Sequence, residues 1–268
     1  KKREKATIMK KGLFDLSGKV SLITGGNGGI GLGMAKGLAS CGSDIAIWGR
    51  NNEKNEKAKE ELKEYGTKII SYEVDVASEE EVSNNMKKVI NDLGRIDSVF
   101  ANAGINVFGG SFENMDTDAY RKVLSVNLDG VFFTFREATK HMVDRAKLGD
   151  AGGSVIGVAS LAGIEGAART QPYSASKGGI ISMIKGIAVE HARYGIRANT
   201  ILPGWIATDM TIPNQKNQKF TDKVITRVPA RRWGEPEDFA GIAVYLASDS
   251  SVYHSGDMFV VDGGYAVF

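Results

Sequence analysis

The sequence has few of the residues that build cross-links or metal sites. Its single cysteine, Cys41, excludes an intramolecular disulfide and fits a reducing compartment, so the expected location is cytoplasmic. The three histidines (His141, His191 and His254) are widely separated and lack metal-ligand spacing, so we expect no metal. No linker rich in proline, glycine or serine and no internal repeat divides the chain, which indicates one domain.

Long hydrophobic runs and a strong net charge are also missing. A membrane-spanning helix needs about 18 apolar residues, whereas the run Gly178–Ile184 ends at Lys185, so no membrane association is expected. The net charge is +2, but residues 1–11 carry six positive charges and one negative, which leaves −3 on the rest. A mildly acidic body lacks the basic footprint of a nucleic-acid-binding protein. Residues 1–11 are expected to be a disordered tail or a cloning remnant, with a targeting or anion-binding arm as the alternative.

Short β-branched runs alternate with longer helical segments through most of the chain. Strands are predicted at Val20–Thr24, Ile45–Trp48, Ile69–Val74, Ile96–Ala101, Val155–Ala159, Ala198–Leu202 and Met258–Val261. Helices are predicted at Ile30–Ser40, Asn55–Tyr65, from Ser78 onward, over most of Asp118–Lys147, and at about Tyr173–Tyr194. This alternation predicts an α/β fold, with a doubly wound parallel sheet and helices on both faces, over residues 12–268. The long polar stretch Ile206–Gly234 is expected to form a lid over a site.

A glycine-rich turn, Thr24–Gly31, follows the first strand and opens a helix. Glycine allows a backbone to turn tightly and to approach a pyrophosphate, and the N-terminus of a helix favours the phosphate charge. The spacing matches neither G-x-G-x-x-G nor the P-loop pattern, but the placement after the first strand favours a dinucleotide site. The residues predicted to contact the dinucleotide here are Gly25, Asn27, Gly29, Ile30 and Gly31.

The end of the second strand bears on the choice of nucleotide. An acidic side chain at this point would bind the ribose 2′-hydroxyl of NAD and repel a 2′-phosphate. The chain instead has Gly49, Arg50 and Asn51, and a guanidinium binds phosphate in a forked geometry. We therefore predict that Arg50 and Asn51 contact the cofactor and that NADP is preferred over NAD. The alternative is that Arg50 is a solvated surface residue.

Tyr173 and Lys177 are four residues apart and share one face of a predicted helix. An ammonium at about 4 Å from a phenol contributes about 4 kcal/mol at an effective dielectric near 20, or about 3 pKa units. Such a shift would bring a phenol of pKa about 10 close to neutrality, where acid–base exchange is efficient. Taken alone, the pair favours an ordinary amphipathic helix with a tyrosine at the core edge and a lysine in water.

Five separated motifs occur in the order typical of one family. Together they resemble the short-chain dehydrogenase/reductase family, in its single-domain branch, over about Gly18–Gly264. That resemblance implies a Rossmann-type fold and a homotetramer or homodimer, with the helices that carry Asn127 and Tyr173 at the dimer faces. The motifs are Thr24–Gly31, Asn102–Gly104, Ser160, Tyr173–Lys177 and Pro203–Gly204.

The resemblance also implies a role for each matching residue. Tyr173 is the acid–base residue, Ser160 steadies the substrate oxygen, Lys177 holds the nicotinamide ribose and lowers the tyrosine pKa, and Asn127 holds a water for proton relay. Tyr173 and Lys177 then contact the cofactor, and Ser160 and Tyr173 the substrate. Further cofactor contacts are implied for Asp75 and Val76 at the adenine, for Asn102, Ala103 and Gly104, and for Pro203, Gly204, Ile206 and Thr208 at the nicotinamide.

The predicted activity is NADP(H)-dependent interconversion of a ketone and a secondary alcohol. Alternatives are a reductase of 3-oxoacyl thioesters or of xenobiotic or steroid ketones, an enoyl reductase, whose tyrosine and lysine are spaced more widely, and a non-catalytic nucleotide-binding regulatory protein. Within the family the chain, particularly Gly12–Lys19, resembles gluconate 5-dehydrogenase-like and 3-deoxy-hexulosonate dehydrogenase-like members, which suggests a sugar acid or related small hydroxy compound. Specificity is expected from Asn106–Ser111, Leu161–Gln171 and the lid. The lid cations would either attract an acidic substrate or form a solvated surface; they are Lys216, Lys219, Lys223, Arg227, Arg231 and Arg232.

Overall fold

The described part of the protein is built around a parallel β-sheet. The computed structural model describes residues 12–107 and 110–268, so the predicted tail at residues 1–11 lies outside the described residues. Seven strands pair in parallel in the order β3-β2-β1-β4-β5-β6-β7. All seven predicted strands are present, with bounds that differ by a few residues: β1 Val20–Thr24, β2 Asp44–Gly49, β3 Ile69–Glu73, β4 Ser98–Ala101, β5 Gly153–Val158, β6 Ile196–Pro203 and β7 Met258–Val261.

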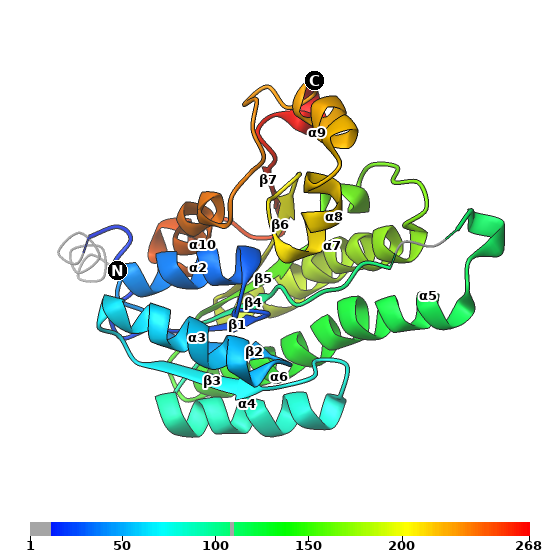
Figure 1. Ribbon diagram of the computed structural model, residues 1–268. Coiled ribbons are helices and arrows are strands. Elements are labelled where there is room, and N and C mark those ends of the chain that lie inside the picture. The colour runs from blue at the N-terminus through cyan, green and yellow to red at the C-terminus, as the bar shows by residue number, and fades with distance from the viewer. Residues whose placement is uncertain (1–11, 108–109) are drawn as a thin grey trace.

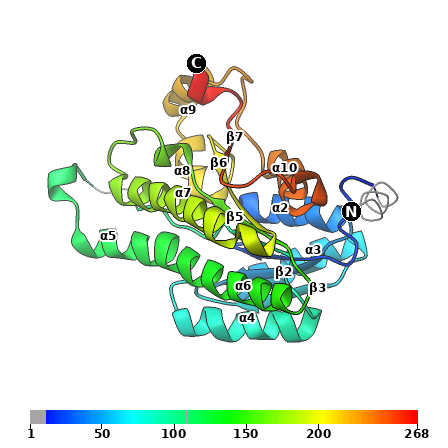
Figure 2. The same cartoon turned by 180° about the vertical axis from the view of Figure 1, so that it is seen from behind.

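Helices cover both faces of the sheet (Figures 1 and 2), as the sequence predicts. Residues of α2, α3 and α10 contribute to one buried apolar cluster, and residues of α4, α6 and α7 contribute to a second one on the other face. Burial of the strands from both sides explains why they are runs of β-branched residues rather than alternating patterns. The helices are α2 Gly29–Ser40, α3 Asn52–Leu62, α4 Glu79–Leu93, α5 Thr117–Leu124, α6 Gly130–Lys147, α7 Gln171–His191, α8 Ile212–Gln215, α9 Gln218–Ile225 and α10 Ala240–Ala247.

Three helical features differ from the sequence prediction. The helical stretch within Asp118–Lys147 is interrupted by a π-helical turn, Ser125–Asp129, between α5 and α6. Helix α3 begins earlier than expected because the Asn51 side chain caps it, accepting a hydrogen bond from Lys54 N at 2.8 Å. The short apolar helix α10 was not predicted, because its eight residues show almost no amphipathic pattern.

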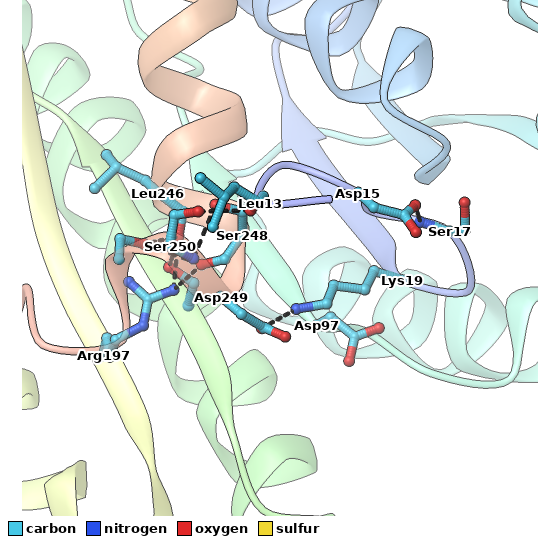
Figure 3. Close-up of polar contacts among 12 residues, drawn as sticks. Leu13, Asp15, Ser17, Lys19, Asp97, Arg197, Leu246, Ser248, Asp249 and Ser250 are labelled. Carbon is cyan, nitrogen blue, oxygen red and sulfur yellow. Dashed lines mark hydrogen bonds and ion pairs between the residues drawn. The ribbon is translucent and has the colours of Figure 1, made fainter. Parts of the chain in front are cut away.

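The N-terminal end of the sheet is tied to the segment after α10 (Figure 3). Lys19 forms an ion pair with Asp249, and the Ser250 hydroxyl donates to the backbone oxygen of Leu13 at 2.5 Å. The buried Arg197 of β6 donates to two backbone oxygens at and after the end of α10, at 2.8 and 3.3 Å. These contacts lie at the opposite end of the strands from the predicted site and fix its scaffold.

The strand order places the predicted motifs at one edge. The order reverses between β1 and β4, and in such sheets ligands bind at the carboxyl ends of the strands beside the reversal. The glycine turn follows β1, Asn102–Gly104 follows β4, and Ser160 follows β5, so all three meet at this edge. No helix of the described residues is both long and apolar enough to cross a membrane.

Candidate active site

A cavity of about 980 Å³ opens at the carboxyl ends of the central strands. It brings together residues that are far apart in the sequence, from the glycine turn to the segment after β6. The predicted site residues that line it are Gly25, Asn27, Gly29, Ile30, Asn102, Ala103, Gly104, Ser160, Tyr173, Lys177, Pro203, Gly204, Ile206 and Thr208.

The glycine turn is tightly packed against the first turn of α2 and the residues after β4. Gly25 has φ +64°, a left-handed conformation that favours glycine, and a Cβ on the buried Gly31 would lie 2.2 Å from the Gly25 oxygen. The turn is joined to β4 through Thr24, whose hydroxyl accepts hydrogen bonds from Asn102 N and Ala103 N, each at 3.0 Å. Asn102 Nδ2 returns a hydrogen bond to the Thr24 oxygen at 3.0 Å. The turn is therefore fixed before any ligand enters.

The cavity side of the same turn fits a phosphate group. Helix α2 starts at Gly29, and within the described residues no side chain caps its first turn. The first N–H groups of a helix lack intrahelical partners and carry a partial positive charge, which suits an anion. A Cβ on Gly28 would meet nothing within 4 Å, so the backbone here is open to a close approach. These features fit the pyrophosphate of a dinucleotide.

Tyr173 and Lys177 lie in the first turns of α7 and both line the cavity. The Lys177 ammonium donates to the backbone oxygen of Val158 at 2.8 Å and lies 5.5 Å from the centre of the Tyr173 ring. An ammonium has three donors, so this bond leaves two for ligand hydroxyls in the cavity. Ser160, at the end of β5, lies beside the phenol, and its hydroxyl accepts from Ala162 N at 3.2 Å.

The pKa values of the pair differ from the expected pattern. Burial lowers the pKa of Lys177 to about 8. Burial also raises the pKa of Tyr173, and a hydrogen bond with Ser160 opposes that rise only in part. The pKa of Tyr173 is thus raised where the sequence predicts a drop, because burial outweighs the hydrogen bond with Ser160. The tyrosine hydroxyl is therefore protonated at neutral pH.

Asn127 lies in the π-helical turn and is fully buried. Its Oδ1 accepts from Ile105 N at 2.8 Å, and its Nδ2 donates to the Ile105 oxygen at 2.9 Å. A Cβ on Gly104 would lie 3.3 Å from Asn127 Oδ1 and 3.5 Å from Lys177 Nζ, so both side chains lie close to Gly104. Such turns are often found at functional sites. Here the turn holds the backbone after β4 against the cavity.

Comparison with known proteins agrees with this geometry. A family described as "Enoyl-(Acyl carrier protein) reductase" matches residues 25–266. Gluconate 5-dehydrogenase of Gluconobacter oxydans is 34% identical over 95% of the chain and 97% of its own length. Sorbose reductase of Schizosaccharomyces pombe is 35% identical over 94% and 98%. The structure of a gluconate 5-dehydrogenase from Burkholderia cenocepacia, in complex with NADP and tartrate, is 33% identical, covers 96% of this chain and 98% of that one, and has a TM-score of 0.89.

The chain belongs to the short-chain dehydrogenase/reductase family. It is an oxidoreductase, and its fold is the Rossmann-type sheet that the sequence motifs imply. No group of His, Cys, Asp or Glu within residues 12–107 and 110–268 could hold a metal ion.

Five predicted cofactor contacts of this oxidoreductase lie outside the cavity lining, and one of them, Gly31, is buried in α2. Arg50 is exposed at the end of β2, and Asn51 caps α3 as described above. Asp75 accepts a hydrogen bond from Ala77 N at 3.0 Å in the turn after β3, and the buried Val76 packs against Gly130. Apart from Gly31, these residues follow β2 and β3, in the nucleotide half of the sheet.

Gly49, beside Arg50, has no space for a side chain. A Cβ there would lie 2.1 Å from Asn27 Nδ2 and 2.5 Å from Asn55 Oδ1. Asn27 Nδ2 in turn donates to Asn55 Oδ1 at 2.7 Å, so this packing positions a residue of the glycine turn. An acidic residue at Gly49 would disturb the turn itself, so cofactor choice is better tested at Arg50.

Several residues that line the cavity of this oxidoreductase were not predicted from the sequence. Lys54 and Lys57 reach the cavity from α3, and Lys54 pairs with Asp209 of the lid segment at 2.7 Å. Tyr265 lines it from the last residues of the chain, and Phe220 from α9. Helical spacing places Lys54 and Lys57 on one face, but only the fold shows that this face points into the cavity. No sequence pattern connects Tyr265 with the site.

The predicted lid, Ile206–Gly234, is closed at its base and covers one side of the cavity. Ala207 N donates to the Gly234 oxygen at 2.8 Å, and Gly234 N to the Trp205 oxygen at 2.9 Å. To attract an acidic substrate directly, the lid cations would have to face the cavity, and they do not. None of the six, all within the described part of the chain, lines the cavity: Lys216, Lys219, Lys223, Arg227, Arg231 and Arg232.

Proposed function

We propose that the protein uses NADP(H) to interconvert a ketone and a secondary alcohol on a sugar acid or a related small hydroxy compound. The observation that carries this proposal is the convergence of Tyr173, Ser160 and Lys177 on the cavity that also contains the open glycine turn. The names of the gluconate 5-dehydrogenase and sorbose reductase relatives support the substrate range.

When bound, the nicotinamide supplies or accepts the hydride. The chain's own residues manage the proton and the carbonyl oxygen. In the reducing direction the Tyr173 hydroxyl, kept protonated by burial, gives its proton to that oxygen, while Ser160 holds the oxygen in place. The two unused donors of Lys177 would bind the nicotinamide ribose, and Asn127 holds the backbone of Ile105 through two hydrogen bonds.

NADP is the proposed cofactor for three reasons. The end of β2 carries Arg50 and no carboxylate, so a 2′-phosphate meets a cation and no repulsion. Lys54 and Lys57 add positive charge on the same side of the cavity. The solved relative from Burkholderia cenocepacia is a complex with NADP.

The proposal extends to the organisation of the protein. Residues 12–268 act as one dinucleotide-binding domain, with residues 206–234 as the substrate lid. We assign the protein to the cytoplasm, with no nucleic-acid or membrane partner, as a homotetramer or homodimer joined through α5, α6 and α7. The exposed Phe132 on α6 and Val189 on α7 are consistent with such an interface.

The direct test removes the phenolic hydroxyl. Tyr173→Phe should lower kcat for ketone-dependent NADPH oxidation by at least about 10²-fold, the usual contribution of a general acid. Tyr253→Phe is the matched control, because Tyr253 is fully exposed and lies outside the cavity lining. Full turnover by Tyr173→Phe would refute the mechanism. A wild-type protein that reduces an enoyl thioester but no ketone would instead support the enoyl reductase alternative.

A further inference from the structure

The last residues of the chain form part of the cavity wall. Tyr265 lines the cavity, and the C-terminus lies beside α9 in both views of the molecule (Figures 1 and 2). On either side of Tyr265, Gly264 N and Ala266 N donate to the Asp262 carboxylate, each at 2.8 Å. A Cβ on Gly204, the residue after β6, would lie 2.5 Å from the Asp262 Cβ, so this segment is packed closely against the end of β6. The backbone that carries Tyr265 therefore has a fixed place beside the site.

Arg227 of the lid contacts both the ring and the hydroxyl of Tyr265. Its guanidinium stacks 4.4 Å from the centre of the ring, and its Nη1 donates to the phenolic oxygen at 3.0 Å. Trp205, which also lines the cavity, packs edge-to-face on the same ring at 6.5 Å between ring centres. Tyr265 lines the cavity and Arg227 does not, so the phenol is the part of this pair that a ligand in the cavity can reach.

The positive charge of Arg227 is not neutralised by a neighbour. Among the described residues no carboxylate forms an ion pair with its guanidinium, whereas Arg232 of the same lid pairs with Asp238 at 2.6 Å. The Tyr265 oxygen accepts from Arg227, so the phenol keeps its own O–H, which has no acceptor among the described residues. A hydrogen bond accepted from a cation polarises the phenol and strengthens it as a donor. The pair thus presents a strong donor, supported by a positive charge, to the cavity.

A donor of this kind suits a carboxylate, which leaves water at low cost only where other groups donate to it. Lysines also line the described part of the cavity, but their positions suit the cofactor. Lys177 lies in α7 beside Tyr173, and Lys54 and Lys57 project from α3 in the nucleotide half of the sheet. In a keto sugar acid such as 5-keto-D-gluconate, the ketone and the carboxylate lie toward opposite ends of the carbon chain. With the ketone at Tyr173, the carboxylate needs a donor on another part of the wall, and Tyr265 after β7 supplies one.

We propose that Tyr265 is a specificity-determining residue that binds the substrate carboxylate through its phenolic hydroxyl, and that Arg227 is a positioning residue that acts through Tyr265. The positive charge of the lid then acts on an acidic substrate indirectly, although none of the lid cations lines the cavity. The inference rests on the proposed function and names the group that distinguishes a sugar acid from an uncharged ketose.

The first experiment removes the hydroxyl of Tyr265 and compares two matched ketones by NADPH oxidation. Tyr265→Phe keeps the ring against Trp205 and Arg227 and deletes only the donor. 5-Keto-D-gluconate and L-sorbose are both six-carbon ketones, and only the first carries a carboxylate. At saturating NADPH, we expect kcat/KM for ketogluconate to fall by at least about tenfold, mainly through KM, because a hydrogen bond to a charged group is lost. The kcat/KM for sorbose should change by less than about twofold.

The comparison of the two ketones separates recognition of the carboxylate from a general disturbance of the pocket. A general disturbance would lower both values together. Equal losses for the two ketones, or no loss for ketogluconate, would overturn the inference and leave the proposed function standing, as would a wild-type protein that reduces sorbose but not ketogluconate. A wild-type protein that reduces neither ketone with NADPH would overturn the proposed function and the inference with it.

The second experiment tests whether Arg227 acts through Tyr265. Arg227→Met should lower kcat/KM for ketogluconate by roughly 3–10-fold in the wild-type chain and by less than about twofold in Tyr265→Phe. Lys223→Met, which removes a charge from an exposed lid position outside the lining, is the matched control and should leave both ketones unaffected. Equal effects of Arg227→Met in the two backgrounds would contradict the proposal. A selective loss of ketogluconate reduction in Lys57→Gln, with full activity in Tyr265→Phe, would place the carboxylate at α3 and overturn it.

Discussion

Two glycines of the same turn allow its folding role to be separated from its binding role. A Cβ on Gly31 would lie 2.2 Å from the Gly25 oxygen and 2.7 Å from Asn102 Nδ2, whereas one on Gly28 would meet nothing within 4 Å. Gly31→Ala must therefore displace the turn or α2 by about 1 Å, and overpacking of this kind costs about 1–3 kcal/mol. In a domain of this size each kcal/mol lowers Tm by about 2–4 °C, so we expect a loss of about 2–12 °C.

Gly28→Ala should leave the thermal stability nearly unchanged and weaken cofactor binding instead. As the residue before α2 it has an extended backbone, and alanine there costs no more than about 1 kcal/mol, so Tm should fall by about 4 °C at most. Its methyl group would stand between the backbone and a phosphate, and we expect NADPH affinity to fall by at least about tenfold. Differential scanning fluorimetry and a fluorescence titration with NADPH measure the two effects. Wild-type Tm in Gly31→Ala, or wild-type affinity in Gly28→Ala, would refute the reasoning.

Three further outcomes are expected. Arg50→Ala should weaken NADPH binding by roughly 10–100-fold, the loss of one charge-assisted hydrogen bond, and leave NADH binding unchanged; equal losses for both nucleotides would contradict this. Because the pKa of Lys177 is lowered to about 8, the folded protein binds fewer protons there than the unfolded chain above that pH. Urea denaturation should therefore show the free energy of unfolding rising by roughly 1–3 kcal/mol between pH 8 and 10, relative to Lys177→Met; parallel profiles would argue against it. Asn127→Ala should destabilise the protein by roughly 2–3 kcal/mol, since both backbone groups of Ile105 lose partners, and should also lower kcat; a change in kcat at unchanged stability would show a role other than positioning.

The local sequence was sufficient to predict the sheet and the main site motifs. Runs such as Val20–Thr24 are buried over their whole length by helices on both sides, so they lack an alternating polar pattern, and this can be recognised from the sequence. The four-residue spacing of Tyr173 and Lys177 likewise places both on one face of α7. Features that depend only on the spacing of residues along one helix or strand, or on one local turn, can thus be predicted from the sequence alone.

Features that depend on distant backbone atoms were not predictable. The amine of Lys177 donates to the Val158 oxygen, which no spacing indicates, and burial of Tyr173 raises its pKa, which the spacing to Lys177 does not indicate either. Tyr265 joins the site only because the chain returns over the lid after β7. The charge of the lid was visible in the sequence, but the partners that occupy Arg227 and Arg232 were not.

The backbone hydrogen bonds at the base of the lid hold its two ends side by side. Because Ala207, Trp205 and Gly234 close the segment into a loop with adjacent ends, its interior can lengthen, shorten or be exchanged without altering the register of β6. Transplanting residues between these two anchor points from one relative to another is therefore a practical route to new substrate preferences.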